Sequence, residues 1–138
     1  MTQEEKDLLL KDLTARLRYR VCAKQYYSVS EDDFLIEGII GEQIYAAYNA
    51  YYSMTYLVEK IKPYLRPLSS MTEEEENEYH NLCKHELEVI PDIEDRYIYT
   101  YYDTVESIDW LNKKQFDYRG LIPMSLALQA PDGMYKTN

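Results

Sequence analysis

The chain of 138 residues is poor in cysteine and glycine, with two and four copies, and it has no long hydrophobic run. Two cysteines, Cys22 and Cys83, are too few to staple a domain, and no CxxC pair or zinc-knuckle spacing is present. The scattered glycines leave no glycine-rich phosphate loop. No apolar run approaches the ~20 residues of a membrane span, and the polar N-terminal segment does not resemble a signal peptide. We therefore expect a soluble, cytoplasmic protein without a membrane contact or a cofactor.

Clustered metal ligands and catalytic residues are also scarce. The best candidates are His80, Cys83 and His85. On a helix, His80 and Cys83 share a face while His85 lies on another, so the three side chains cannot close round one zinc ion. A nucleophile pair of Cys83 and His80 would need an orienting group that we cannot identify. We expect no metal site, no catalytic residue and no enzyme, and we keep an enzyme of unknown type as an alternative.

Basic residues are also few, since the chain has 15 of them against 25 acidic residues and its net charge is −10. Residues 71–95 hold nearly all of the excess, with ten acids against Lys84 alone. Such a surface repels phosphates, which argues against nucleic acid as the main ligand. The run Glu73, Glu74, Glu75 and Glu76 has two interpretations: a solvated helix face that aids solubility, or an acidic surface that occupies a basic groove on another protein.

Tyrosine is abundant, with 16 copies against two phenylalanines and one tryptophan. Tyrosine combines apolar area with a polar tip, so it suits strands, half-buried surfaces and interfaces. Residues 43–58 fit both a helical period and a strand composition, and we predict two strands with a turn near 49–53. Exposed tyrosines in this stretch would offer a partner surface or favour a homo-oligomer. The candidates are Tyr45, Tyr48, Tyr51 and Tyr52.

Three capping boxes mark the starts of three helices. They are Thr2 with Glu5, Thr72 with Glu75, and Asp103 with Glu106. The predicted helices span residues 3–17, 73–87 and 104–115. Their apolar stripes are Leu9, Leu13 and Leu17 in the first, Tyr79, Leu82 and Cys83 in the second, and Val105, Ile108 and Leu111 in the third, where Trp110 or Phe116 closes the edge. After the third helix, Gly120 permits a turn with positive φ.

Further strands are predicted from alternating or β-branched runs at residues 18–27, 34–40 and 96–102. Pro63 and Pro67 each remove a backbone donor, so we predict a short helical or 3₁₀ turn between them. The apolar segment 121–128 is expected to pack on the core, ahead of a turn at 131–133.

These elements predict one α+β domain over residues 1–138. Its small antiparallel sheet runs from about residue 18 to residue 58 and is extended by 96–102. The N-terminal helix and the two further helices complete the domain.

Two further groups of residues have a structural and a functional interpretation. The basic residues Arg16, Arg18, Arg20 and Lys24 interleave with Tyr19, Tyr26 and Tyr27, as on a surface that binds single-stranded nucleic acid. A nucleic-acid-associated accessory protein is therefore an alternative function, although such arginines more often pair with nearby acids. Arg119 either reaches a partner carboxylate or has a structural role, bonding the helix end or pairing with Asp109 or Asp117.

Four blocks of the chain carry a resemblance. They read MTQEEKDLLLKDL from residue 1, IKPYLRPLSSMTEEE from residue 61, DWLN from 109 with FDYRGLI from 116, and APDGMY from 130. They resemble a family of short uncharacterised proteins of anaerobic gut bacteria and of their phages and mobile elements. The resemblance implies a bacterial host and an SH3-like sheet after the first helix, and it brings no known reaction.

We therefore predict a non-catalytic interaction or regulatory protein of a phage or mobile element. It would bind a host or phage protein through the acidic helix or the tyrosine-rich sheet. One form of this function is an inhibitor of a host defence protein or of a nucleic-acid-binding protein.

Overall fold

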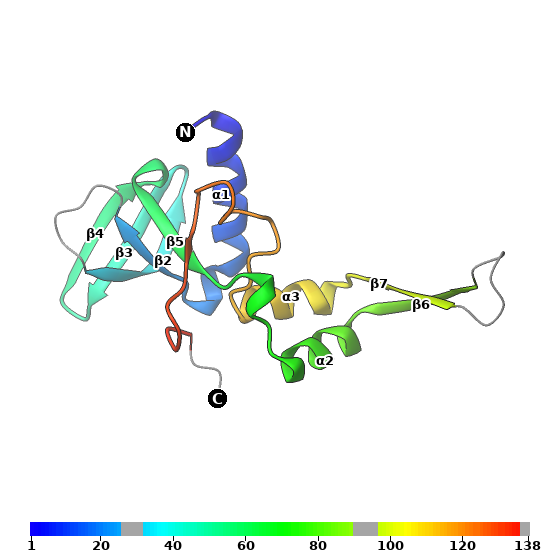
Figure 1. Cartoon of the computed structure of the whole chain (residues 1–138). Helices are drawn as coiled ribbons and strands as arrows, with labels where there is room; N and C mark the ends of the chain where they lie inside the picture. Colours follow the sequence, from blue (N-terminus) through cyan, green and yellow to red (C-terminus); the bar gives the residue numbers. More distant parts are fainter. Residues whose placement is uncertain (26–31, 90–96, 136–138) are drawn as a thin grey trace.

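The computed structural model describes residues 1–25, 32–89 and 97–135. Within these ranges the chain is α+β, as predicted, with three helices, a six-stranded mixed sheet and a separate two-stranded hairpin. The helices are α1 (Gln3–Arg16), α2 (Glu73–Leu82) and α3 (Val105–Lys113). The strands are β1 (Cys22–Gln25), β2 (Asp33–Ile40), β3 (Gln43–Asn49), β4 (Tyr52–Leu57), β5 (Ile61–Leu65), β6 (Lys84–Val89), β7 (Tyr97–Tyr102) and β8 (Leu128–Gln129). Figure 1 shows the sheet and α1 at one end and the β6–β7 hairpin at the other.

Helix α1 begins as its sequence predicts. The Thr2 hydroxyl accepts a hydrogen bond from the Glu5 backbone, and the Glu5 carboxylate accepts one from the Thr2 backbone. Leu9 and Leu13 are fully buried and join the core that fills the space between the helix and the sheet. No helix in the described part of the chain is long and apolar enough to cross a bilayer.

The sheet has the strand order β4-β3-β2-β1-β5-β8, and all pairs are antiparallel except β5 with β8. The tyrosine-rich stretch forms two strands, as predicted, and Gly41 takes a φ of 59° in the tight turn that precedes β3. The strand expected over 18–27 begins only at Cys22, because residues 17–19 form a 3₁₀ turn and the backbone of Arg20 is in the left-handed region. Two further predictions lie outside the described residues. They are the end of this strand at Tyr26 and Tyr27, and residues 28–31 of the turn expected over 28–33.

The turn predicted between Pro63 and Pro67 is wrong, because Ile61–Leu65 is strand β5. Pro63 is in register with Ala23 of β1. On the other side, β8 pairs only with Tyr64 and Leu65. A strand tolerates proline where no neighbour requires its missing N–H, and position 63 lies ahead of the β8 pairing.

The apolar segment after Gly120 packs on the core, as expected, with Leu121, Leu126 and Ala127 buried. Gly120 has a φ of 75°, which fits its predicted role in the turn. Farther on, the Tyr135 hydroxyl donates to the Tyr64 carbonyl oxygen at 2.7 Å and accepts from the Cys22 backbone at 2.8 Å. Burial raises the pKa of Tyr135, so the phenol stays protonated and keeps this bridge.

The second helix is shorter than predicted. Its capping box of Thr72 and Glu75 is present, but α2 ends at Leu82, and residues 84–89 form strand β6. β6 pairs with β7, so the predicted extension of the main sheet by residues 96–102 is wrong. The chain break expected over 91–95 and Arg96 at the predicted start of β7 lie outside the described residues.

The third helix has a different cap from the predicted one. Thr104 caps α3 and forms the reciprocal pair with Ser107, where Asp103 with Glu106 was expected. The shift by one residue leaves Val105 84% exposed, so Val105 does not belong to the buried stripe. Leu111 is buried as predicted.

Candidate protein-interaction surface

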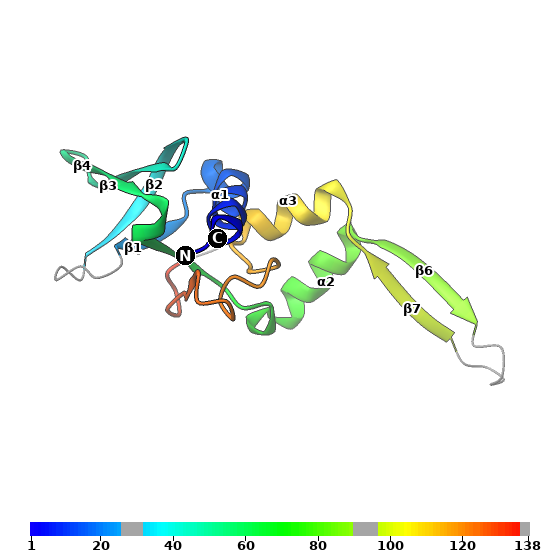
Figure 2. The same ribbon diagram turned by 90° about the horizontal axis from the view of Figure 1, so that it is seen from above.

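The β6–β7 hairpin, called the arm below, projects from the ends of α2 and α3 away from the main sheet (Figures 1 and 2). Its strands are in regular antiparallel register, with Lys84 opposite Tyr102 and Leu87 opposite Tyr99. A two-stranded hairpin alone is marginally stable in water, and packing against a helix or a further strand stabilises it.

One face of the arm is apolar and aromatic. The register places His85 opposite Tyr101 and Leu87 opposite Tyr99, and side chains directly opposite each other point to the same face. Leu87, Tyr99 and Tyr101 are 52%, 62% and 42% exposed. Contiguous exposed apolar side chains of this kind mark interaction sites. The other face carries Lys84, Glu86, Thr100 and Tyr102.

The base of the arm is held by aromatic stacking. The His80 ring of α2 stacks on Tyr101 with centroids 4.0 Å apart and planes at 9°, and the His85 ring meets Tyr101 edge-on at 4.7 Å. The Thr104 hydroxyl donates to the Leu82 carbonyl oxygen at 2.7 Å, which ties the start of α3 to the end of α2. These contacts fix the direction in which the arm leaves the helices.

Tyr79 reinforces the same junction. Its hydroxyl donates to the Asp103 carboxylate, and its ring stacks on Trp110 with centroids 5.8 Å apart. Burial, and then the bond to Asp103, raise the pKa of Tyr79, so the phenol keeps its proton. The predicted inner face of the second helix is thus partly correct, because Tyr79 and the buried Cys83 both face the junction.

The acidic run of α2 divides into two roles. Glu73, Glu74 and Glu76 are exposed. Glu75 turns inward, where its side chain is only 12% exposed and accepts two hydrogen bonds from Arg66 at 2.7 and 2.8 Å. The paired guanidinium is the main reason that the pKa of Glu75 lies below its usual range, and burial opposes it. Three of the four predicted partner-binding glutamates are therefore on the surface, and the fourth stabilises the fold.

Replacing Glu75 by glutamine should cost about 1–3 kcal/mol of unfolding free energy at pH 7, because Arg66 loses its charged partner. The pKa of Glu75 is lower in the folded state than the 4.5 of the unfolded chain, so its contribution is complete above pH 4.5. The contribution is lost as the pH falls through the folded-state pKa. Urea unfolding of both proteins from pH 7 to pH 3 should show curves that converge in acid. A gap between the curves that does not change with pH would contradict this role.

The predicted tyrosines lie at the far end of the molecule from the arm. Tyr48 is half-buried, with its ring 5.4 Å from that of Phe34 and its hydroxyl bonded to that of Tyr56 at 2.6 Å. Burial raises the pKa of Tyr48. Tyr52 contacts Tyr48 and is exposed, and Tyr51 in the β3–β4 turn is 98% exposed. Tyr45 lies on the opposite face of the sheet, against Gly38. The tyrosine-rich sheet and the acidic helix are thus two separate surfaces.

Arg119 has a structural role, with a partner that the sequence did not identify. Its guanidinium donates to the buried Asp12 carboxylate and to the Tyr118 hydroxyl, at 3.0 and 2.8 Å. The two predicted partners are engaged elsewhere. Asp109 accepts from Tyr19, and Asp117 accepts from the backbone of residues 121 and 122.

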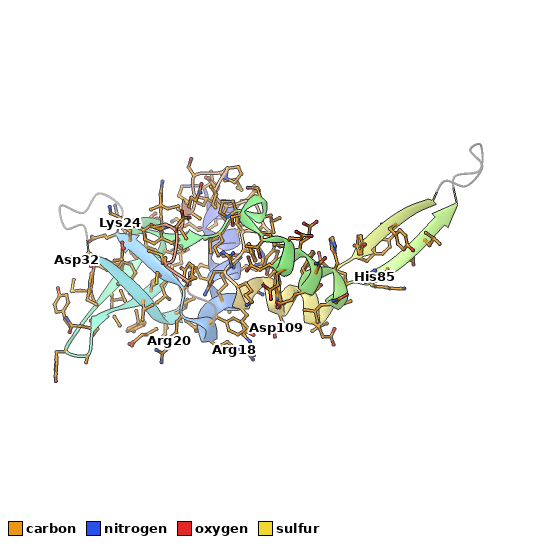
Figure 3. The ribbon with its side chains drawn as sticks, turned by 60° about the horizontal axis from the view of Figure 1, so that its bottom comes forward. Arg18, Arg20, Lys24, Asp32, His85 and Asp109 are labelled. Carbon is orange, nitrogen blue, oxygen red and sulfur yellow. The ribbon has the colours of Figure 1, made fainter. Side chains whose placement is uncertain are left out.

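The basic stretch does not form one continuous surface. Arg16 is fully buried and paired with Asp12 at 2.9 Å. The Arg18 guanidinium lies 3.9 Å from the Asp109 carboxylate. Figure 3 shows Lys24 well apart from Arg18 and Asp109. This arrangement gives the nucleic-acid alternative little support.

The cluster of His80, Cys83 and His85 is divided between two elements, because Cys83 ends α2 and His85 lies on β6. Within the described ranges, no three His, Cys, Asp or Glu side chains lie close enough to hold a metal ion. A hollow of about 640 Å³ beside the start of α2 is lined by polar groups that include Arg66, Lys114 and Asp132. Of the two cations in this lining, Arg66 is paired with Glu75, and the Lys114 ammonium lies 5.9 Å from the centroid of the Trp110 ring, which favours a structural role for both.

The arm is the part of the surface that sequence reasoning missed. Its signal was present, since residues 86–89 alternate polar and apolar in the sequence, and the tyrosines of 97–101 occupy every second position. The capping box of Thr72 marks the start of the helix but not its end, and the helix predicted over 73–87 overlaps this alternation.

Comparison of the chain with protein-family models, with curated proteins and with solved structures gave no match.

Proposed function

We propose that the chain is a non-catalytic interaction protein that binds a partner protein through the arm and the exposed acids of α2. The observation that carries this proposal is the arm itself, a projecting two-stranded ribbon with Leu87, Tyr99 and Tyr101 exposed on one face. Tyrosines in such positions are typical energetic centres of protein interfaces, because they bury large areas at a low cost in side-chain entropy.

The acidic helix and the arm are consecutive elements of the chain. Only Cys83 separates the end of α2 from the start of β6, and the exposed glutamates lie in the first turn of α2, about 9 Å of helix before that end. The segment 71–95 has a net charge of −9. A partner that fits both parts has an apolar groove for the arm and a basic rim that faces α2, since opposite charges steer the approach and fix the register.

A basic groove of this kind is typical of nucleic-acid-binding proteins. We therefore infer that the chain acts as a competitor, with Glu73, Glu74 and Glu76 occupying the sites of phosphates. The resemblance to proteins of phages and mobile elements supports a host protein as the target. An SH3-like arrangement of β1 to β5 stays a prediction, supported by the antiparallel order β4-β3-β2-β1-β5.

The proposal is tested by changing the charge of α2 without changing its fold. A variant with Glu73, Glu74 and Glu76 each replaced by lysine keeps the Glu75–Arg66 pair. A partner captured from the bacterial host should lose affinity for this variant on the order of 100-fold. The matched control replaces Glu4, Glu37 and Glu42, which are exposed and lie on other elements, so the net charge changes equally. Isothermal titration calorimetry with the purified partner measures the affinity of the acidic variant and of its control.

A second variant, Leu87→Ser with Tyr99→Ser, tests the arm with no change of charge. Loss of affinity in both the acidic and the arm variants, with the control unchanged, is the expected result. An equal loss in the acidic variant and its control would mean non-specific attraction and would contradict the proposal. So would a partner that binds the arm variant as tightly as the wild type.

A further inference from the structure

The six-stranded sheet ends in two edges of unequal length. β8 has two residues, whereas β4 has six and pairs with β3 alone among the described residues. An unpaired strand presents a row of backbone N–H and C=O groups that can accept another strand. The register is regular from Ser53 to Leu57, because the irregularity lies beside the β3–β4 turn.

This edge lacks the usual protection against pairing. Residues 43–58 contain no charged side chain and no proline, although 29% of the chain is charged. Native sheets guard their edges with charges, prolines or bulges, because bare edges associate. The absence of all charge over two whole strands therefore favours pairing at this edge.

Apolar side chains are exposed on both faces of the edge. Tyr52 and Met54 lie on the face that also carries the buried Ala46, and both are exposed. Leu57 and Tyr45 are exposed on the other face. A strand added to β4 would cover parts of Tyr52, Met54 and Leu57, whereas Tyr45 lies on β3 against Gly38.

We propose that β4 pairs antiparallel with β4 of a second copy, so that one sheet runs across a two-fold dimer. A two-fold axis through Met54 keeps each face of the sheet continuous. It places Tyr52 opposite Tyr56 of the second copy, and Ser53 opposite Thr55. Aromatic pairs and hydroxyl pairs are both favourable across strands.

The absence of charge on β4 favours a second copy as the occupant. Two molecules of net charge −10 repel each other over most approaches, and the acidic segment 71–95 is the strongest source. Figure 1 shows α2 and the arm at the end opposite to β4, so pairing at β4 keeps the two acidic segments far apart. Residues 33–66 carry four acids and three bases and are almost neutral. An isologous contact also needs no complementary charge, because the same uncharged strand meets itself.

The test is the mass in solution of the whole chain and of Thr55→Lys. Thr55 is exposed, so lysine is tolerated in the monomer but brings like charges together across the proposed interface. Light scattering over a concentration series should give twice the 16.5 kDa of the monomer for the wild type. Thr55→Lys should weaken the dimer on the order of 100-fold or more. Met124→Lys, an exposed position in a turn, is the control of equal charge and should behave as the wild type.

Circular dichroism checks that Thr55→Lys is folded, and Ser53→Lys replaces it if it is not. A wild type that stays monomeric up to about 1 mM overturns the proposal. A dimer that survives both edge substitutions overturns it as well, since the contact would lie elsewhere. The arm is not used in this contact, so loss of partner binding and loss of the dimer are separate results.

Discussion

Replacement of Asp12 by alanine is expected to reduce the free energy of unfolding by about 3–5 kcal/mol, a large part of the stability of a small domain. Asp12 and Arg16 are both fully buried and joined at 2.9 and 3.1 Å, and Arg119 approaches the same carboxylate at 3.0 Å. Without Asp12, the Arg16 guanidinium would keep its charge in the core, and the Phe116 carbonyl oxygen would be its one remaining hydrogen-bond acceptor among the described residues. Urea unfolding followed by the fluorescence of Trp110 measures the loss.

Asp7→Ala is the matched control, because Asp7 lies on the same helix and is exposed. It should change stability by less than about 0.5 kcal/mol. The double variant Asp12→Leu with Arg16→Met removes both charges and should be more stable than Asp12→Ala, since the main cost is the unpaired charge. A loss below about 1 kcal/mol in Asp12→Ala would show that the network is dispensable.

Replacement of Phe116 by alanine is the second substitution with a large expected effect, and it should reduce the free energy of unfolding by about 3–5 kcal/mol. The Phe116 ring is fully buried, stacks on Trp110 with centroids 5.7 Å apart, and lies 4.1 Å below the Arg66 guanidinium. Its backbone also pairs with Arg66, so residue 116 joins the end of β5 to α3. Alanine leaves a cavity and removes the cation–π contact.

Phe116→Leu separates volume from the aromatic contacts. Leucine refills most of the space, so we expect a loss of roughly 1.5 kcal/mol or less. Thermal and urea unfolding of both variants give the comparison. An alanine variant as stable as the leucine variant would mean that the site collapses without a cavity and would refute the expected packing role.

Local chemistry was enough to predict the starts of α1 and α2 and the strands of the tyrosine-rich stretch. The boxes at Thr2 and Thr72 involve residues three positions apart, and their geometry does not depend on the rest of the fold. The end of α2 could not be found in this way. Its last turn competes with the pairing of β6 to β7, and the energy of that pairing comes from residues more than ten positions away.

Burial was the property that the sequence could not give for charged residues. Arg16 and Arg18 are two positions apart in the chain, yet the first lies in the core and the second on the surface. The spacing of Asp12 and Arg16 at four residues was compatible with an ion pair, as many exposed pairs are. Only the packing of residues 116–119 against α1 decides that this pair is enclosed, and those residues lie about a hundred positions away.

The bridge from Tyr135 has a consequence for the order of events during translation. Cys22 and Tyr135 are separated by 113 residues, and the hydroxyl of Tyr135 joins them to Tyr64. Tyr64 of β5 precedes Tyr135 by 71 residues, and at about 5–20 residues per second a ribosome needs about 4–14 s to travel that distance. During most of this interval the nascent β5 has neither β8 nor Tyr135 beside it and is an open edge. Residues 128–135 therefore dock on β5 after the strands that precede them have been made, and chaperones can bind the open edge until then.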